Sequence, residues 1–114
     1  MLKLLVKIIF LLYAVDASAE ECQEMRFAPG ASSAVVSGKV IEGSPMCLTF
    51  GTGAGQTARL ELSGSDNACF TIEDVVDCQA NYSFETTQRT YRFRIFQLFP
   101  RAPAETVSLR LAIQ

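Results

Sequence analysis

The sequence of 114 residues contains no histidine and no tryptophan. Without histidine there is no Ser-His or Cys-His nucleophile pair, no histidine metal ligand, and no side chain whose ordinary pKa lies near neutrality. The four cysteines include no Cys-x-x-Cys pair, so their spacing does not favour a zinc site. Carboxylates cluster between positions 73 and 85, but such groups on β-turns more often form a solvated surface than an acid/base pair. The composition therefore predicts a protein that is not an enzyme and needs no metal or cofactor.

Long hydrophobic runs are missing after the first 19 residues. Those residues open with two lysines, continue with an apolar run over 8–15 and end in Ala17-Ser18-Ala19, a pattern typical of a cleaved secretory signal peptide. The apolar run is shorter than the roughly 20 residues that a membrane-spanning helix needs. We therefore predict a leader over 1–19 and a single domain over 20–114 that is periplasmic or secreted and does not insert into a membrane.

A strong positive charge is also absent. Without the two lysines and one aspartate of the leader, eight basic and eleven acidic residues remain, a net charge of −3. This balance argues against nucleic acid and against an anionic membrane surface as partners. The carboxyl-terminal quarter is nevertheless locally basic, because it holds five of the eight cations: Arg89, Arg92, Arg94, Arg101 and Arg110.

The sequence does contain a regular succession of short apolar segments and turn residues. Turn signals recur every eight to fourteen residues, and no segment shows a helical period. This pattern is typical of an all-β fold, and we predict an antiparallel β-sandwich of about eight strands. The acidic segment 73–80 remains without an assignment. The expected strands cover 23–27, 33–41, 46–50, 57–63, 68–72, 81–85, 91–98 and 107–114.

The last 25 residues organise the predicted fold. In the final strand Val107, Leu109, Leu111 and Ile113 alternate with polar or small residues, so one face of that strand should be buried. We predict that this strand and the one before it form a long hairpin, joined by a loop that contains prolines.

The loop of that hairpin is the candidate binding site. Phe99 and Arg101 belong to the residue types that dominate interface energies, and Pro100 between them stiffens the backbone. A loop that is already rigid loses less entropy when it enters a partner's cleft. We therefore predict that these residues contact another protein.

The four cysteines of an exported chain predict two disulfides. Strand alternation points Cys22 and Cys47 outward on strands that can be neighbours. Cys69 also points outward, and Cys78 follows it after an acidic turn at a distance that suits a local bond. Of the three pairings that four cysteines allow, we predict Cys22–Cys47 and Cys69–Cys78.

Several segments resemble the periplasmic inhibitors of goose-type lysozyme, and the resemblance extends over nearly the whole mature chain. They are the run Met25-Arg26-Phe27-Ala28-Pro29-Gly30-Ala31-Ser32-Ser33-Ala34 followed by Ser37-Gly38, the turn Ala54-Gly55-Gln56, and Tyr91-Arg92-Phe93-Arg94-Ile95.

The resemblance implies an antiparallel β-sandwich in the periplasm that blocks a muramidase by inserting loops into its substrate cleft. It points to the same Phe99–Arg101 loop as the partner-binding site, with Arg94, Ser32 and Ser33 in supporting positions. The alternative is a carbohydrate- or envelope-binding module without inhibitory activity, which would use tyrosines and exposed phenylalanines in place of the missing tryptophan.

Overall fold

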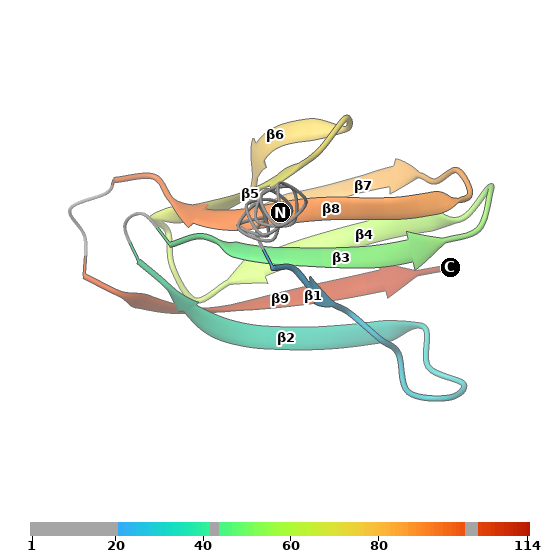
Figure 1. The fold of residues 1–114 in the computed structure, drawn as a ribbon, viewed down its shortest axis with the longest axis horizontal. Helices are drawn as coiled ribbons and strands as arrows, with labels where there is room; N and C mark the ends of the chain where they lie inside the picture. The colour runs from blue at the N-terminus through green and yellow to red at the C-terminus, as the bar shows by residue number, and fades with distance from the viewer. Residues whose placement is uncertain (1–20, 42–43, 100–102) are drawn as a thin grey trace, which may run out of the picture.

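The protein is a two-layered β-sandwich in the computed structural model, which describes residues 21–41, 44–99 and 103–114 (Figure 1). Over these ranges no helix is long and apolar enough to cross a membrane. The strands are β1 (Gln23–Glu24), β2 (Ser33–Val40), β3 (Met46–Thr52), β4 (Thr57–Ser63), β5 (Ala68–Ile72), β6 (Val76–Gln79), β7 (Asn81–Glu85), β8 (Arg89–Gln97) and β9 (Glu105–Ile113).

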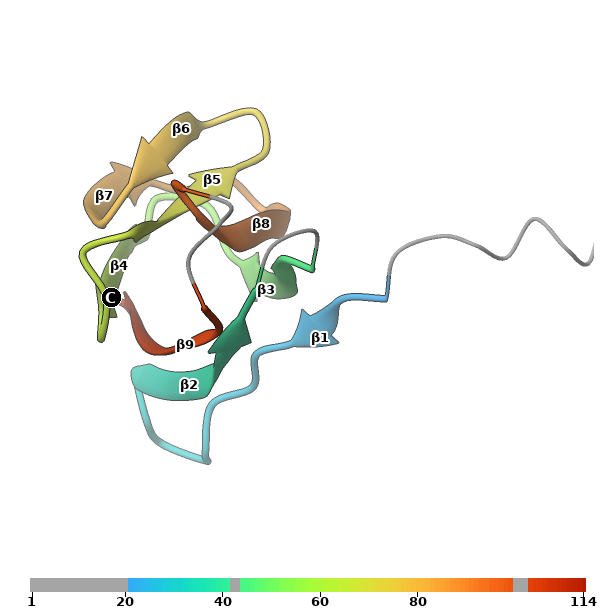
Figure 2. The same ribbon diagram turned by 90° about the vertical axis from the view of Figure 1, so that its left-hand side faces the viewer.

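Two sheets face each other across the core, as the view in Figure 2 shows. One sheet has the strand order β1-β3-β8-β5-β6, and the other has the order β2-β9-β4-β7. Neighbouring strands are antiparallel except for the short parallel pair of β1 and β3. The predicted antiparallel sandwich with two disulfides is therefore confirmed.

The predicted carboxyl-terminal hairpin is wrong. β8 pairs with β3 and β5 in one sheet, whereas β9 pairs with β2 and β4 in the other. Alternation predicted the buried face of each strand correctly, since Val107, Leu109 and Leu111 are buried. It cannot identify the hydrogen-bonded neighbour, because two strands that face the same core from opposite sheets show the same pattern as two strands that pair.

The structure also changes the strand count from about eight to nine within the described residues. The segment 73–80 left without an assignment contains β6, an edge strand whose register with β5 is irregular between Phe70 and Ile72. The first strand is shorter than the predicted 23–27. Met25 follows it, donates its amide to the Thr49 carbonyl at 2.8 Å and is buried in the core.

Phe93 lies at the centre of the core. Its ring packs edge-on against Phe50 and Phe70, with centroid distances of 5.8 and 6.5 Å, and none of the three side chains is more than 1% exposed. Leu60, Leu109 and Leu111 of the opposite sheet are also fully buried and complete the core from the other side.

Both predicted disulfides, Cys22–Cys47 and Cys69–Cys78, are present. Cys47 and Cys69 point away from the core, as the alternation predicts, yet both are buried. Each of them is bonded to a cysteine of the adjacent edge segment: Cys22 directly precedes β1, which lies beside β3, and Cys78 lies in β6, which lies beside β5.

Gly64, in the turn between β4 and β5, should not tolerate a side chain. Its φ is +103°, and a Cβ atom would lie 2.6 Å from the carbonyl oxygen of Thr106. We expect Gly64→Ala to lower the free energy of unfolding by about 2 to 3 kcal/mol, from backbone strain and steric overlap together. Urea denaturation measures the loss.

Gly55 provides the matched control for Gly64. Its φ is +73°, but an added Cβ would meet nothing within 4 Å, so Gly55→Ala adds the backbone strain alone, about 1 kcal/mol. Equal losses in the two variants would contradict the steric explanation.

Candidate functional site

Exposed apolar side chains gather at one end of the sandwich. Among the described residues four large hydrophobic side chains are exposed, and three of them, Ile41, Leu98 and Phe99, lie at the ends of β2 and β8. Both strands end where β9 begins, at the left in Figure 1. Phe99 is the most exposed of the four, at 72%. We call Ile41, Leu98 and Phe99 the apolar tip, a grouping typical of a protein contact surface.

A network of hydrogen bonds holds the backbone of the apolar tip. The Asn67 carbonyl oxygen accepts from the Leu98 amide at 2.8 Å, and the Asn67 side-chain oxygen accepts from the Phe99 amide at 3.0 Å. The Glu105 carboxylate accepts hydrogen bonds from Ser65 at 2.6 Å, Gln97 at 3.0 Å and Asn67 at 3.3 Å. The turn before β5 is thereby joined to the end of β8 and the start of β9, so Phe99 projects from a backbone that is already fixed.

Glu105 should make the stability of this end depend on pH. Hydrogen bonds donated by Ser65, Gln97 and Asn67 hold the pKa of the Glu105 carboxyl below its usual range. A carboxyl whose pKa is lower in the folded state stabilises the fold above its unfolded pKa, about 4.3, and the stabilisation is lost as the pH falls through the folded pKa. We expect the difference in unfolding free energy between wild type and Glu105→Gln to be constant from neutral pH down to about pH 5 and to shrink below about 4.3.

Urea titrations at several pH values measure this difference. Glu85→Gln, at an exposed position, is the control for the removal of one surface carboxylate. A difference for Glu105→Gln that stays constant down to about pH 3 would contradict the assignment.

The six residues predicted to bind a partner do not all lie at this end. Phe99 belongs to the apolar tip, whereas Pro100 and Arg101 lie outside the described residues. Arg94 lies in the middle of β8, on the outer face of its sheet, where its guanidinium is 2.8 Å from the Glu73 carboxylate.

Ser32 and Ser33 lie at the opposite end of the molecule. Ser33 pairs with Ala112 near the end of β9, whereas the apolar tip adjoins the start of β9. The two serines therefore do not form one contiguous site with Phe99.

Ile41 and the network around Asn67 were not predicted as parts of a site. Ile41 reads in the sequence as the last apolar residue of a strand, and only the pairing of β2 with β9 shows which end of the molecule it occupies. The segment 64–67 lies between two predicted strands, but nothing in its sequence indicates that Asn67 binds the backbone that follows β8.

The fold matches solved structures of lysozyme inhibitors. The crystal structure of PliG from Aeromonas hydrophila, a periplasmic lysozyme inhibitor of g-type lysozyme, superposes with a TM-score of 0.72 and 23% identity over 82% of this chain and 96% of that one. The chain has the fold of the PliG inhibitors. PliG from Salmonella Typhimurium gives a TM-score of 0.68 and 16% identity, over 84% of this chain and all of that one.

The same architecture also occurs outside the PliG proteins. The pre-peptidase C-terminal domain of collagenase from Bacillus anthracis matches with a TM-score of 0.61 and 12% identity, over 83% of this chain and 96% of that domain. Comparison by sequence alone found no matching protein family and no matching curated protein. The fold is therefore shown, and the function has to be argued from the site.

Proposed function

We propose that this protein is an exported inhibitor of a goose-type lysozyme and that it binds the enzyme through the apolar tip and the loop that follows. The observation that carries the proposal is that, of the four large apolar side chains exposed among the described residues, three lie at the end of the molecule where Phe99 is found. The PliG fold supports it, because two of the structures with this fold are described as inhibitors of g-type lysozyme.

The residue types of the apolar tip and of the loop that follows it suit the cleft of a glycosidase. Such clefts carry catalytic carboxylates, so a cation inserted from outside would be attracted. In this proposal Arg101 approaches the catalytic glutamate, and Phe99 packs on the wall of the cleft. The fixed backbone around Asn67 reduces the entropy that binding costs.

The proposal includes no chemistry by this chain. Among the described carboxylates of the acidic segment, Glu73 pairs with Arg92 and Arg94, and Asp74 pairs with Arg89. These are ion pairs on an outer face, an arrangement that stabilises a surface and does not position an acid and a base around a substrate.

Export is the second part of the proposal. Disulfides form and persist in oxidising compartments, and this chain has two. The leader over 1–19 would direct the chain there, and the domain over 20–114 would remain. The two PliG proteins are themselves described as periplasmic.

A cell-wall clearing assay tests the inhibition. We expect the mature protein to inhibit a goose-type lysozyme, and Phe99→Ala to weaken inhibition by roughly 10- to 100-fold, the range of an interface hot spot. Arg101→Ala should weaken it by about 10-fold or more. A chicken-type lysozyme provides the test of specificity.

Val35→Ala is the matched control, because Val35 is 64% exposed and is the one large exposed hydrophobic of the described residues that lies outside the tip. It should leave inhibition unchanged. The proposal fails if the wild type does not inhibit at micromolar excess. If Val35→Ala and Phe99→Ala have the same effect on inhibition, the assignment of the binding surface to the apolar tip is wrong.

A further inference from the structure

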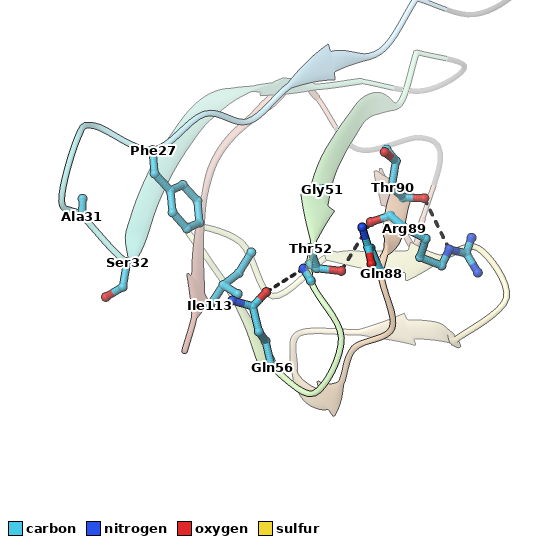
Figure 3. A pocket seen from close by; sticks show the side chains of 11 residues that line it. Phe27, Ala31, Ser32, Gly51, Thr52, Gln56, Gln88, Arg89, Thr90 and Ile113 are labelled. Carbon is cyan, nitrogen blue, oxygen red and sulfur yellow. Dashed lines mark hydrogen bonds between the residues drawn. The ribbon is translucent and has the colours of Figure 1, made fainter.

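A hollow lies at the end of the sandwich away from the apolar tip. It is an open groove of about 610 Å³, formed where the segment before β2, the β3–β4 connection and the β7–β8 connection meet Ile113 near the end of β9. Figure 3 shows Phe27, Ala31 and Ser32 on one side and Gln88, Arg89 and Thr90 on the other, with Gln56 between them. The volume lies in the range of small-molecule sites.

Uncharged polar groups dominate the lining of the groove. Ser32, Thr52, Gln56, Gln88 and Thr90 contribute hydroxyl and amide groups, and no carboxylate is among the described lining residues. Gly51 and Gly53 leave backbone uncovered. The aromatic member is Phe27, whose side chain is partly buried against the core.

Hydrogen bonds fix the walls before any ligand arrives. Gln56 Oε1 accepts from the Gly53 amide at 2.8 Å, and Thr86 donates to the Gly53 carbonyl at 2.7 Å. Thr52 donates to the Thr87 carbonyl at 2.7 Å, which joins the end of β3 to the β7–β8 connection. Both loops are thereby held in one arrangement, which lowers the entropic cost of binding.

The charge of the groove argues against an anion or a metal ion as its ligand. Its one cation, Arg89, lies over the Tyr91 ring at 4.6 Å and 3.5 Å from Asp74, so its charge is already partly matched. A metal ion would find no carboxylate in the described lining. An apolar ligand would leave the amides and hydroxyls without partners, which costs free energy.

A neutral ligand rich in hydroxyl groups meets all of these conditions. Its hydroxyls can donate to and accept from amide and hydroxyl side chains, and the C–H face of a sugar ring can lie against Phe27. We propose that this groove binds a neutral oligosaccharide. The proposal does not depend on lysozyme inhibition, because the groove and the apolar tip occupy opposite ends of the molecule.

Titration of the ¹⁵N-labelled mature protein with cellohexaose and chitohexaose, followed by amide chemical shifts, tests the proposal. We expect shifts confined to the groove segments and saturation with a Kd of roughly 0.1 to 1 mM for at least one sugar. The same spectra report whether each variant is folded.

Gly51→Thr should fill the groove without disturbing the fold, since the nearest atom to an added Cβ is Thr90 Oγ1 at 4.0 Å. We expect it to weaken sugar binding by about tenfold or more. Gln88→Ala, at an exposed position, removes an amide and should weaken binding in the same direction. Val35→Ala is the control and should bind as the wild type does.

The proposal is overturned if neither sugar shifts the groove amides at concentrations up to about 5 mM. It is also overturned if the shifts lie elsewhere, or if both groove variants bind as well as the wild type.

Discussion

Phe93→Ala is expected to lower the free energy of unfolding by about 4 kcal/mol. Phe93 is fully buried between Phe50 and Phe70. The substitution removes the side chain on which both neighbouring rings pack, and the surrounding strands can close the cavity only in part. Because a small domain has roughly 5 to 15 kcal/mol of stability, the variant should be close to its unfolding limit at 37 °C. Urea denaturation at 25 °C measures the loss.

Phe96→Ala is the matched control, since Phe96 lies on the same strand but faces away from the core and is only partly buried. Its loss should be about 1 kcal/mol. If the two variants lost the same stability, the outer face of β8 would have to be as tightly packed as the core, and the assignment of faces would be wrong.

Replacing both Cys22 and Cys47 by serine is expected to cost roughly 3.5 kcal/mol, because the disulfide closes a loop between residues 25 positions apart and restricts the unfolded chain. The equivalent replacement of Cys69 and Cys78, which are 9 positions apart, should cost roughly 2.6 kcal/mol on the same model. Measuring the free energies of unfolding of both double variants shows which disulfide contributes more stability. A larger loss from the shorter loop would contradict the chain-entropy explanation.

The sequence was sufficient to predict the fold class, both disulfides and the buried faces. The fold class and the buried faces depend on local alternation alone. The disulfides follow from the redox environment, the outward phase of the cysteines and the short separation of Cys69 from Cys78. The neighbours of β8 and β9 were not predictable, because proximity in the sequence favours a hairpin, whereas the sandwich places these two consecutive strands in opposite sheets. The edge strand β6 was missed because its pattern is short and its residues are mostly polar.

The candidate site was predictable only in part. Phe99 was identified from its residue type beside two prolines, and the structure leaves it exposed at the apolar tip. Ile41 reaches the same end through the register of β2 with β9, which no local pattern contains. The groove is built from Phe27, Gln56 and Gln88, which come from separate segments, so the sequence offered no signal that they line one surface.

The strand order also determines when the protein can fold. β8 lies between β3 and β5 in one sheet, and β9 lies between β2 and β4 in the other. Each of these two strands is therefore an interior member of its sheet. Most pairings therefore join residues far apart in the chain, and neither sheet can be completed until the carboxyl-terminal strands are available. The two sheets accordingly cannot be assembled on a nascent chain before β8 and β9 have been synthesised. That delay is compatible with export through a channel that accepts only extended polypeptide.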